Sequence, residues 1–323
     1  MNSKDPFLGI ALVLIIAIAI WSFIDIPVVS PSPSTEDIPT NLEVNDAHES
    51  FLLTTEFTEK ELLYIEALQN KGVLKMATRE LDFSYLKHDD GSITGFNYLF
   101  AKAFSESLEV DLDVKLVGWD TFFEIDGVVP ENVQSDDSVV YTPDILNEVD
   151  LLCNYMTILP WREKLFFMVP IFPVKQMLIK RNDVQVNTID DLKGKTISIF
   201  RNTSYHLRLN EIEKELDTTF EYHFVEDEID QNIMVSDGFA EVSVMDSIIA
   251  IRDITRYNNL EMGFPITDVQ VYGWVVNFDN PELKSVLEKY VDYAKKTGKF
   301  DAIWYDEYDI THLEYLNIID YNY

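Results

Sequence analysis

One arginine stands out because of the residues around it. Arg162 lies in NYMTILPWREKLFFMVPIF, residues 154–172, where it follows a proline and a tryptophan and precedes an apolar run. A guanidinium offers two parallel donors to a carboxylate, and this pairing strengthens in a closed, dry cleft. Two interpretations follow: Arg162 binds the carboxylate of a ligand, or it is a surface charge balanced by Glu163.

The charge balance of the chain makes each of its bases informative. The 323 residues include 57 acids and 25 bases, which gives a formal net charge of -32. A field of this sign repels DNA, RNA and anionic lipid, so we expect no nucleic-acid partner. Hydrophobic residues make up 47% of the chain, enough to bury a sizeable core.

Residues that hold metals or act as nucleophiles are scarce. The five histidines are scattered without metal-ligand spacing, so we expect no metal and no cofactor. The one cysteine, Cys153, lies in the apolar run VDLLCNYM and is interpreted as a small buried hydrophobe. Glu80 or Asp82 could be proposed as an acid-base group, but neither belongs to a distinctive catalytic pair. The expectation is therefore a protein without catalytic residues and without enzymatic activity.

An apolar segment near the N-terminus predicts a membrane anchor. Residues 7–24, FLGIALVLIIAIAIWSFI, are 18 positions without a charge, which is near the lower limit for a span. Lys4 precedes the segment and acids follow it, which favours a cytoplasmic residue 1 and a periplasmic or extracellular location for the bulk of the chain. We expect residues 1–26 to be a cytoplasmic tip and an uncleaved transmembrane helix of a single-pass protein in the cell (inner) membrane. A cleaved signal peptide is the alternative, although the segment lacks a small-x-small cleavage site.

The rest of the chain has the pattern of an α/β protein. Residues 27–49 begin with a Pro-, Ser- and Thr-rich stretch and are predicted to form an extended linker. Thr58 and Glu61 predict a capping box for a helix that Gly72 closes. From Val73 onward strands and helices alternate, which is typical of sheets covered by helices.

Four stretches, in this order, resemble the family-3 extracytoplasmic solute-binding proteins: residues 73–104, 149–172, 188–205 and 272–308. The helix FTEKELLYIEALQNKG, which feeds directly into the first strand, is similar to the substrate-binding half of the membrane-bound lytic transglycosylase F enzymes, without their catalytic domain. The resemblance implies a two-lobed periplasmic-binding-protein type II fold, with two hinge crossings and the ligand between the lobes. Lobe 1 is expected at residues 50–174 plus 275–323, and lobe 2 at 175–274.

The resemblance also implies ligand-binding residues. Arg162 matches the family arginine that binds the ligand carboxylate, and Thr157 would add a hydroxyl. Thr203 and Ser204 begin a helix of lobe 2, where hydroxyls and free N–H groups form an anion site. Simple N-capping of that helix is the alternative.

Further candidates lie at the ends of predicted strands. Asp246 matches the family aspartate that pairs with a ligand ammonium, and capping of the next helix is its alternative. Phe83 and Tyr85 follow the first strand as aromatic walls of the cleft, with core packing as the alternative. Arg79, on the same loop, is a second candidate cation.

The implied function is capture of a solute outside the cytoplasm. The small-molecule ligand would be an amino acid or a small peptide-like carboxylate, delivered to an ABC-type permease. The alternative is a ligand-sensing or regulatory module that binds a cell-wall fragment such as a muropeptide and acts through a sensor partner. A dehydratase on the same fold is a third hypothesis. Trp161 stands where the family usually has an acid, and this departure leaves the ligand open.

Overall fold

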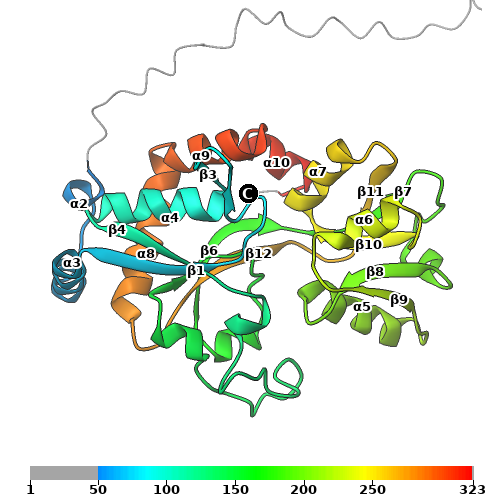
Figure 1. Cartoon of the computed structure of the whole chain (residues 1–323), viewed down its shortest axis with the longest axis horizontal. Coiled ribbons are helices and arrows are strands. Elements are labelled where there is room, and N and C mark those ends of the chain that lie inside the picture. Colours follow the sequence, from blue (N-terminus) through cyan, green and yellow to red (C-terminus); the bar gives the residue numbers. More distant parts are fainter. Residues whose placement is uncertain (1–49, 322–323) are drawn as a thin grey trace, which may run out of the picture. The chain divides into compact units, whose positions relative to one another are not determined.

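The computed structural model describes residues 50–321, which form two α/β lobes (Figure 1). The predicted anchor and linker, residues 1–26 and 27–49, lie outside the described residues. No helix within 50–321 is long and apolar enough to cross a membrane.

Lobe 1 is built on a five-stranded sheet of order β4-β1-β5-β12-β6. β1 pairs in parallel with β4 and β5, whereas β12 runs antiparallel to both β5 and β6. The carboxyl ends of β1 and β5 therefore lie at one edge of the sheet, and the loops that follow them carry candidate site residues. The strands are β1 (Val73–Thr78), β4 (Asp111–Leu116), β5 (Leu151–Leu152), β6 (Phe167–Val174) and β12 (Gln270–Val276).

Helices and an irregular segment cover the two faces of this sheet. Alternating residues of β1, β5 and β12 point to opposite sides, so that Trp274 joins the large core and Val275 a smaller one. The smaller core is rich in aromatic residues from the segment 119–166, including the 3-10 helices η1 (Asp120–Phe122), η2 (Asp144–Asn147) and η3 (Arg162–Lys164). The helices of lobe 1 are α2 (Phe51–Thr54), α3 (Glu59–Lys71), α4 (Phe96–Ser107), α8 (Pro281–Lys296), α9 (Lys299–Tyr308) and α10 (His312–Ile318), beside the small hairpin of β2 (Leu86–Lys87) and β3 (Ile93–Thr94).

Local sequence signals fix the start and end of α3. The Thr58 hydroxyl accepts from the backbone N–H of Glu61 at 3.3 Å, and the Thr58 N–H donates to the Glu61 carboxylate at 2.6 Å. Gly72 ends the helix in the left-handed conformation, with φ of 76°. The predicted capping box and glycine cap are both confirmed.

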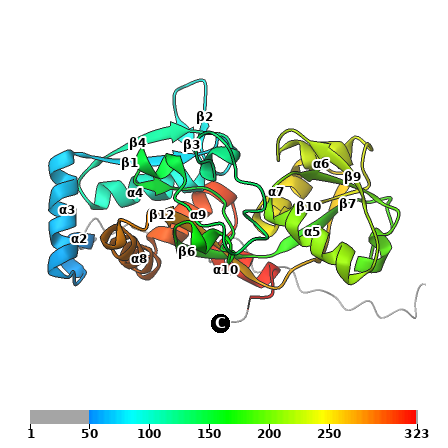
Figure 2. The ribbon, with the colours of Figure 1, turned by 90° about the horizontal axis from the view of Figure 1, so that it is seen from below.

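Lobe 2 has a second five-stranded sheet, of order β11-β7-β10-β8-β9. α5 covers one face of it, and α6 and α7 cover the other (Figures 1 and 2). The strands are β7 (Gln176–Arg181), β8 (Thr196–Phe200), β9 (Glu221–Val225), β10 (Val242–Asp246) and β11 (Leu260–Pro265). The helices are η4 (Ile189–Leu192), α5 (Ser204–Glu215), α6 (Asp230–Ser236) and α7 (Ser247–Arg256).

The chain passes between the two sheets twice, once between β6 and β7 and once between β11 and β12. The second crossing lies earlier than the predicted lobe boundary at 274/275. β12 begins at Gln270, opposite Val174 of β6, and its whole length lies in the first sheet. Residues 270–274 therefore belong with lobe 1, because their backbone hydrogen bonds are made there.

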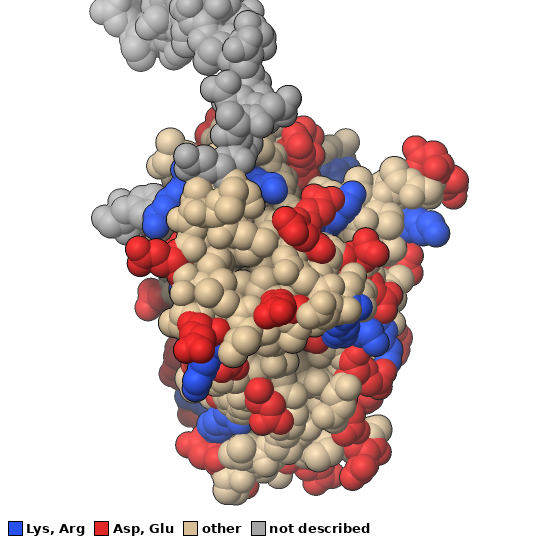
Figure 3. Space-filling view, turned by 90° about the vertical axis from the view of Figure 1, so that its left-hand side faces the viewer, with Lys and Arg blue, Asp and Glu red and all other residues tan. Residues whose placement is uncertain are grey.

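The charge of the surface and the burial of Cys153 both agree with the expectations from the sequence. Acidic side chains are scattered over the face shown in Figure 3, with fewer basic ones between them. Cys153 is fully buried, and its burial raises the pKa of the thiol well above its ordinary value. The prediction of a buried, hydrophobe-like cysteine is confirmed.

Candidate ligand-binding site between the lobes

Arg162 lies at the first position of η3, buried among aromatic rings. Only 1% of the residue is exposed, so the surface-charge interpretation is wrong. Its Nη1 donates to the carbonyl oxygen of Thr157 at 2.7 Å, while its buried Nε has no hydrogen-bond partner among the described residues. Burial lowers the pKa of Arg162 to about 10. The guanidinium carbon lies 5.1, 5.4 and 5.6 Å from the ring centroids of Trp161, Trp119 and Phe123.

Asp246 ends β10 on the other lobe and is 2% exposed. Its Oδ2 accepts hydrogen bonds from the hydroxyls of Tyr205, at 2.8 Å, and Tyr272, whereas Oδ1 is buried without a partner in the described chain. Burial raises the pKa of Asp246 to about 7, although the two tyrosine hydroxyls lower it. Its side chain makes no capping hydrogen bond to α7, so the capping alternative is wrong.

Hydroxyl groups from the two lobes meet at Thr157 and Ser204. The Oγ1 of Thr157 lies 3.4 Å from the Oγ of Ser204, the first residue of α5, and both residues are buried. Thr203 caps α5 instead: its hydroxyl accepts from the N–H of His206 at 3.3 Å and donates to the carbonyl of Phe200 at 2.9 Å. The structure therefore brings Thr157 and Ser204 together and gives Thr203 the capping role.

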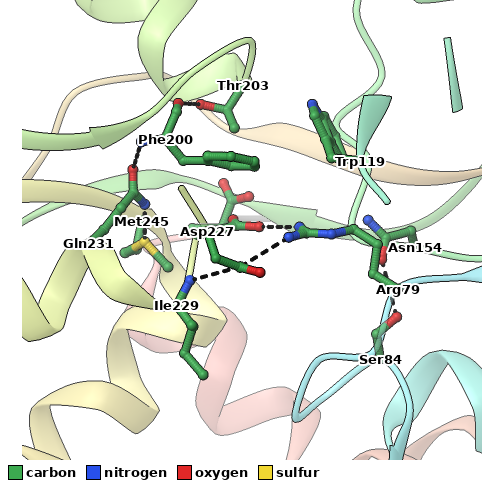
Figure 4. A network of polar contacts seen from close by, with 12 residues as sticks. Arg79, Ser84, Trp119, Asn154, Phe200, Thr203, Asp227, Ile229, Gln231 and Met245 are labelled. Atoms are coloured by element: carbon green, nitrogen blue, oxygen red, sulfur yellow. Dashed lines mark hydrogen bonds and ion pairs between the residues drawn. The ribbon is translucent and has the colours of Figure 1, made fainter. Parts of the chain in front are cut away.

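Arg79 follows β1 and reaches across to lobe 2 (Figure 4). Its Nη1 donates to Oε2 of Glu228 at 2.8 Å, and its Nη2 donates to Oδ1 of Asp227 at 3.2 Å. The guanidinium carbon lies 5.8 Å from the ring centroid of Trp119 and 5.7 Å from that of Phe200. The predicted second cation thus has protein partners in this conformation.

A cavity of about 30 Å³ lies between the lobes, and Glu228, the partner of Arg79, is among the residues that line it. Phe83 lines it, and the guanidinium carbon of Arg252 lies 4.2 Å from the centre of the Phe83 ring. Tyr85 does not line it, because its ring packs against Tyr98 at 5.3 Å. The lining residues are Leu81, Asp82, Phe83 and Tyr155 from lobe 1, and Glu228, Ile229, Met245, Ile249, Arg252 and Asp253 from lobe 2.

Sequence reasoning missed several contacts that shape the cleft. Asp82 accepts from Arg252 and Arg256 of α7, each at 2.8 Å, and so joins the lobes a second time. Two signals in the sequence could have indicated charged residues between the lobes. The two arginines lie four residues apart on one helix, and an acidic run follows β9. Nothing in the sequence marked Tyr205 or Tyr272 as partners of Asp246.

Curated relatives of the chain are enzymes. No family model matches the sequence. Membrane-bound lytic murein transglycosylase F of Desulfosudis oleivorans is 29% identical over 216 residues, 65% of this chain and 43% of that protein. The protein of the same name from Saccharophagus degradans is 27% identical over 246 residues, 73% of this chain and 44% of the relative. The chain thus spans less than half the length of these relatives.

Solved structures similar to this chain include amino-acid-binding proteins. A P235GK mutant of ArgBP from T. maritima has a TM-score of 0.60 at 21% identity and covers 76% of this chain and 99% of its own. An ancestral arginine-binding protein bound to arginine has a TM-score of 0.60 at 20% identity, over 73% and 98% of the two chains. The ancestral amino-acid-binding protein AncCDT-1, described as a precursor of cyclohexadienyl dehydratase, has a TM-score of 0.61 at 19% identity, over 76% and 99%. At these identities the likeness shows the fold.

The expectation of a protein without enzymatic activity is contradicted by the sequence relatives, because they are named for an enzyme. The expectation rested on the lack of a catalytic pair within these 323 residues. That argument was too narrow, because the chain aligns with less than half of each relative. The roles of the candidate residues toward a ligand stay predictions. The chain is similar in sequence to the membrane-bound lytic murein transglycosylase F proteins and has the two-sheet α/β fold of the amino-acid-binding proteins, as its sequence resemblance predicted.

Proposed function

We propose that the cleft binds a small ligand with both a carboxylate and an ammonium group, an amino acid or a short peptide. The observation that carries this proposal is a pair of buried polar atoms without partners among the described residues, Nε of Arg162 and Oδ1 of Asp246. A buried charged group that lacks a partner costs free energy. A ligand carboxylate at Arg162 and a ligand ammonium at Asp246 would remove both costs at once.

Neighbouring groups support this orientation of the ligand. The hydroxyls of Thr157 and Ser204 lie between the two lobes, and Ser204 opens the twelve-residue helix α5. Hydroxyl donors and a helix N-terminus both favour a carboxylate. The aromatic rings around Arg162 exclude water, which strengthens a guanidinium–carboxylate pair.

We propose further that the protein is anchored in the membrane by residues 7–24 and works on the extracytoplasmic side. The uncharged segment supports the anchor. An amino acid ABC transporter substrate-binding protein of Streptococcus pneumoniae, AbpA bound to L-arginine, shares the fold with a TM-score of 0.60 at 20% identity. An ABC permease is therefore the first partner to test.

The names of the sequence relatives favour a second candidate function. A binding module related to lytic murein transglycosylase F would sense a cell-wall fragment and regulate glycan cleavage. The two functions differ in ligand: transport predicts free amino acids or short peptides, and sensing predicts muropeptides. Both use the same cleft.

The experiment is identification of the ligand, followed by titration. Mass spectrometry of ligand carried through native purification names the candidates, and calorimetry with amino acids, dipeptides and muropeptides measures them. Binding should be strongly weakened in Arg162→Ala and Asp246→Asn and unchanged in Arg208→Ala, which removes a guanidinium held by Glu211 and Glu215 on α5. No heat and no thermal shift with any of these ligands would count decisively against the proposal.

A further inference from the structure

Arg79 occupies the cleft in the manner of a bound guanidinium ligand. Although it is a charged residue on a loop, only 5% of it is exposed. Its guanidinium lies between Trp119 of lobe 1 and Phe200 of lobe 2, and carboxylates of lobe 2 accept its hydrogen bonds (Figure 4). Two aromatic faces and two carboxylates are the surroundings that a guanidinium prefers.

Lobe 2 holds its part of these surroundings with its own hydrogen bonds. The Phe200 N–H donates to Gln231 at 2.6 Å, and its carbonyl accepts from Thr203. Glu228 accepts from the hydroxyl of Tyr205 at 3.0 Å. Asp227 accepts from the N–H of Ile229 at 3.3 Å. Phe200, Glu228 and Asp227 are therefore positioned by contacts that do not involve Arg79.

These surroundings adjoin the cavity between the lobes through one residue, Glu228. Glu228 both pairs with Arg79 and lines the cavity between the lobes. The other charged residues of the cavity are already paired: Asp82 with Arg252 and Arg256, and Asp253 with Arg252. A cationic ligand side chain entering the cavity would find each of these carboxylates engaged, and the one engaged by Arg79 is Glu228.

We infer that Arg79 is a specificity-determining residue: it fills a guanidinium-binding subsite formed by Glu228, Asp227, Phe200 and Trp119, and it excludes cationic side chains from the cleft. The subsite stands on its own geometry, whereas its effect on selectivity rests on the proposed ligand-binding function. Removal of Arg79 would leave two carboxylates facing two rings, a site suited to an external guanidinium or ammonium group.

The first experiment tests the subsite with a probe that has no carboxylate. The full-length chain, its Arg79→Ala variant and the control Arg208→Ala are titrated with ethylguanidinium, and melting temperature and heat of binding are recorded. Arg208 also contacts two carboxylates, but within α5, so its removal leaves the subsite filled. We expect a saturable rise in melting temperature for Arg79→Ala alone. A folded Arg79→Ala protein that responds no more than the unsubstituted protein overturns the inference.

The second experiment tests selectivity with two amino acids of the same shape. L-arginine carries a guanidinium, whereas L-citrulline carries a neutral ureido group. Arg79→Ala should bind arginine about tenfold or more tightly relative to citrulline, as expected for charge-assisted hydrogen bonds, whereas the unsubstituted protein should not prefer arginine. Adding Glu228→Gln to Arg79→Ala should abolish the gain.

The outcomes separate this inference from the proposed function. If ethylguanidinium binds Arg79→Ala but neither amino acid does, the subsite stands and the carboxylate–ammonium site fails. If both amino acids bind the variant equally, the inference fails and the proposed function stands. Should Arg79→Ala not fold, Arg79→Gln, which removes the charge and keeps an amide donor, is tested in the same way, and the same absence of response overturns the inference.

Discussion

Arg162 and Asp246 influence each other across the cleft without forming an ion pair. The charge of Asp246 raises the pKa of Arg162, and the charge of Arg162 lowers that of Asp246, but burial dominates both values. No nitrogen–oxygen contact within 4.0 Å joins the two side chains in the part of the chain that the structure describes. The two charges therefore act on each other's pKa without direct contact between the side chains.

Substitution of Arg162 should weaken binding strongly while the protein still folds. Arg162→Ala removes the donors proposed for the ligand carboxylate, and we expect affinity to fall by about tenfold to hundredfold, the range for charge-assisted hydrogen bonds. Arg162→Lys keeps a positive charge without the planar fork and should be intermediate. Calorimetry measures affinity, and circular dichroism checks for a cooperative thermal transition. Undiminished affinity in a folded Arg162→Ala protein would show that the carboxylate site lies elsewhere.

Binding should depend on the ionisation of Asp246. Because the pKa of Asp246 is about 7 without ligand, the carboxyl is half protonated near neutrality, and only its ionised form attracts an ammonium. Affinity for the ligand should therefore rise as pH increases through about 7. Asp246→Asn should bind weakly at every pH, with this rise gone. A pH-independent affinity of the unsubstituted protein between pH 6 and 8 would contradict the assignment.

The same carboxyl should affect stability with the opposite trend. Its pKa is raised from 3.8 to about 7 on folding, so the native state binds more protons than the unfolded state between these values. The free energy of unfolding should fall in this window as pH rises, by at most about 1.4 kcal/mol per pH unit from this group. The difference between the unsubstituted protein and Asp246→Asn in urea denaturation, measured without ligand, isolates this contribution from that of other groups.

The tyrosines that bind Asp246 should set the pH at which it ionises. The hydroxyls of Tyr272 and Tyr205 lower its pKa against the effect of burial. Tyr205→Phe removes one donor, so the midpoint of the binding pH profile should move upward. Tyr305→Phe, at a half-exposed position of α9, is the control and should leave it unchanged. A downward shift in Tyr205→Phe would mean that the hydroxyl does not stabilise the ionised form.

Asp82 should hold the lobes together. It accepts hydrogen bonds from both Arg252 and Arg256 and is 25% exposed at its side chain. Asp82→Asn weakens both pairs, and we expect a cost of about 1 kcal/mol to the conformation in which Asp82 joins the lobes, the upper range for partly exposed pairs. Single-molecule energy transfer between dyes on the two lobes should show a larger open population. Asp190→Asn, which affects an exposed pair with Lys193 inside lobe 2, should not change it.

Gly95 should tolerate no side chain. Its φ is 116°, and an added Cβ would lie 2.5 Å from the carbonyl carbon and oxygen of Ser84, which are backbone atoms and cannot rotate away. Gly95→Ala should therefore lose several kcal/mol of stability, whereas Gly91→Ala, with φ of 87° and open space, should lose about 1 kcal/mol. Midpoints of urea denaturation compare the two. Equal losses would indicate that the loop shifts to make room.

Sequence reasoning succeeded where the controlling interactions are local. The capping box of Thr58 and Glu61 and the glycine cap at Gly72 depend on neighbours within four residues. Arg162 was singled out because its own surroundings were unusual. The alternation of buried strands and amphipathic helices was sufficient for the α/β fold, because each element must bury one face.

The remaining features depend on residues far apart in the chain. Arg79 and Glu228 are separated by 149 positions, and Asp82 and Arg252 by 170, so only the folded chain brings them together. The boundary near β12 was misplaced because the sequence does not mark where the chain leaves one sheet for the other, which happens before β12 begins. Tyr85 was assigned to the cleft because it follows β1, but the turn after β1 points its ring toward Tyr98.

Lobe 2 is one uninterrupted insertion between β6 and β12, so residues 50 and 321 both move with lobe 1. A partner tethered at either position would move together with lobe 1 when the two lobes move relative to each other. Dyes placed at these two positions would report a constant separation. α10 contacts both lobes, since the Tyr315 hydroxyl donates to the carbonyl of Pro173 and lies 2.8 Å from the hydroxyl of Ser247, the neighbour of Asp246. A movement of lobe 2 would therefore change a contact of this short helix while the distance between residues 50 and 321 stayed the same.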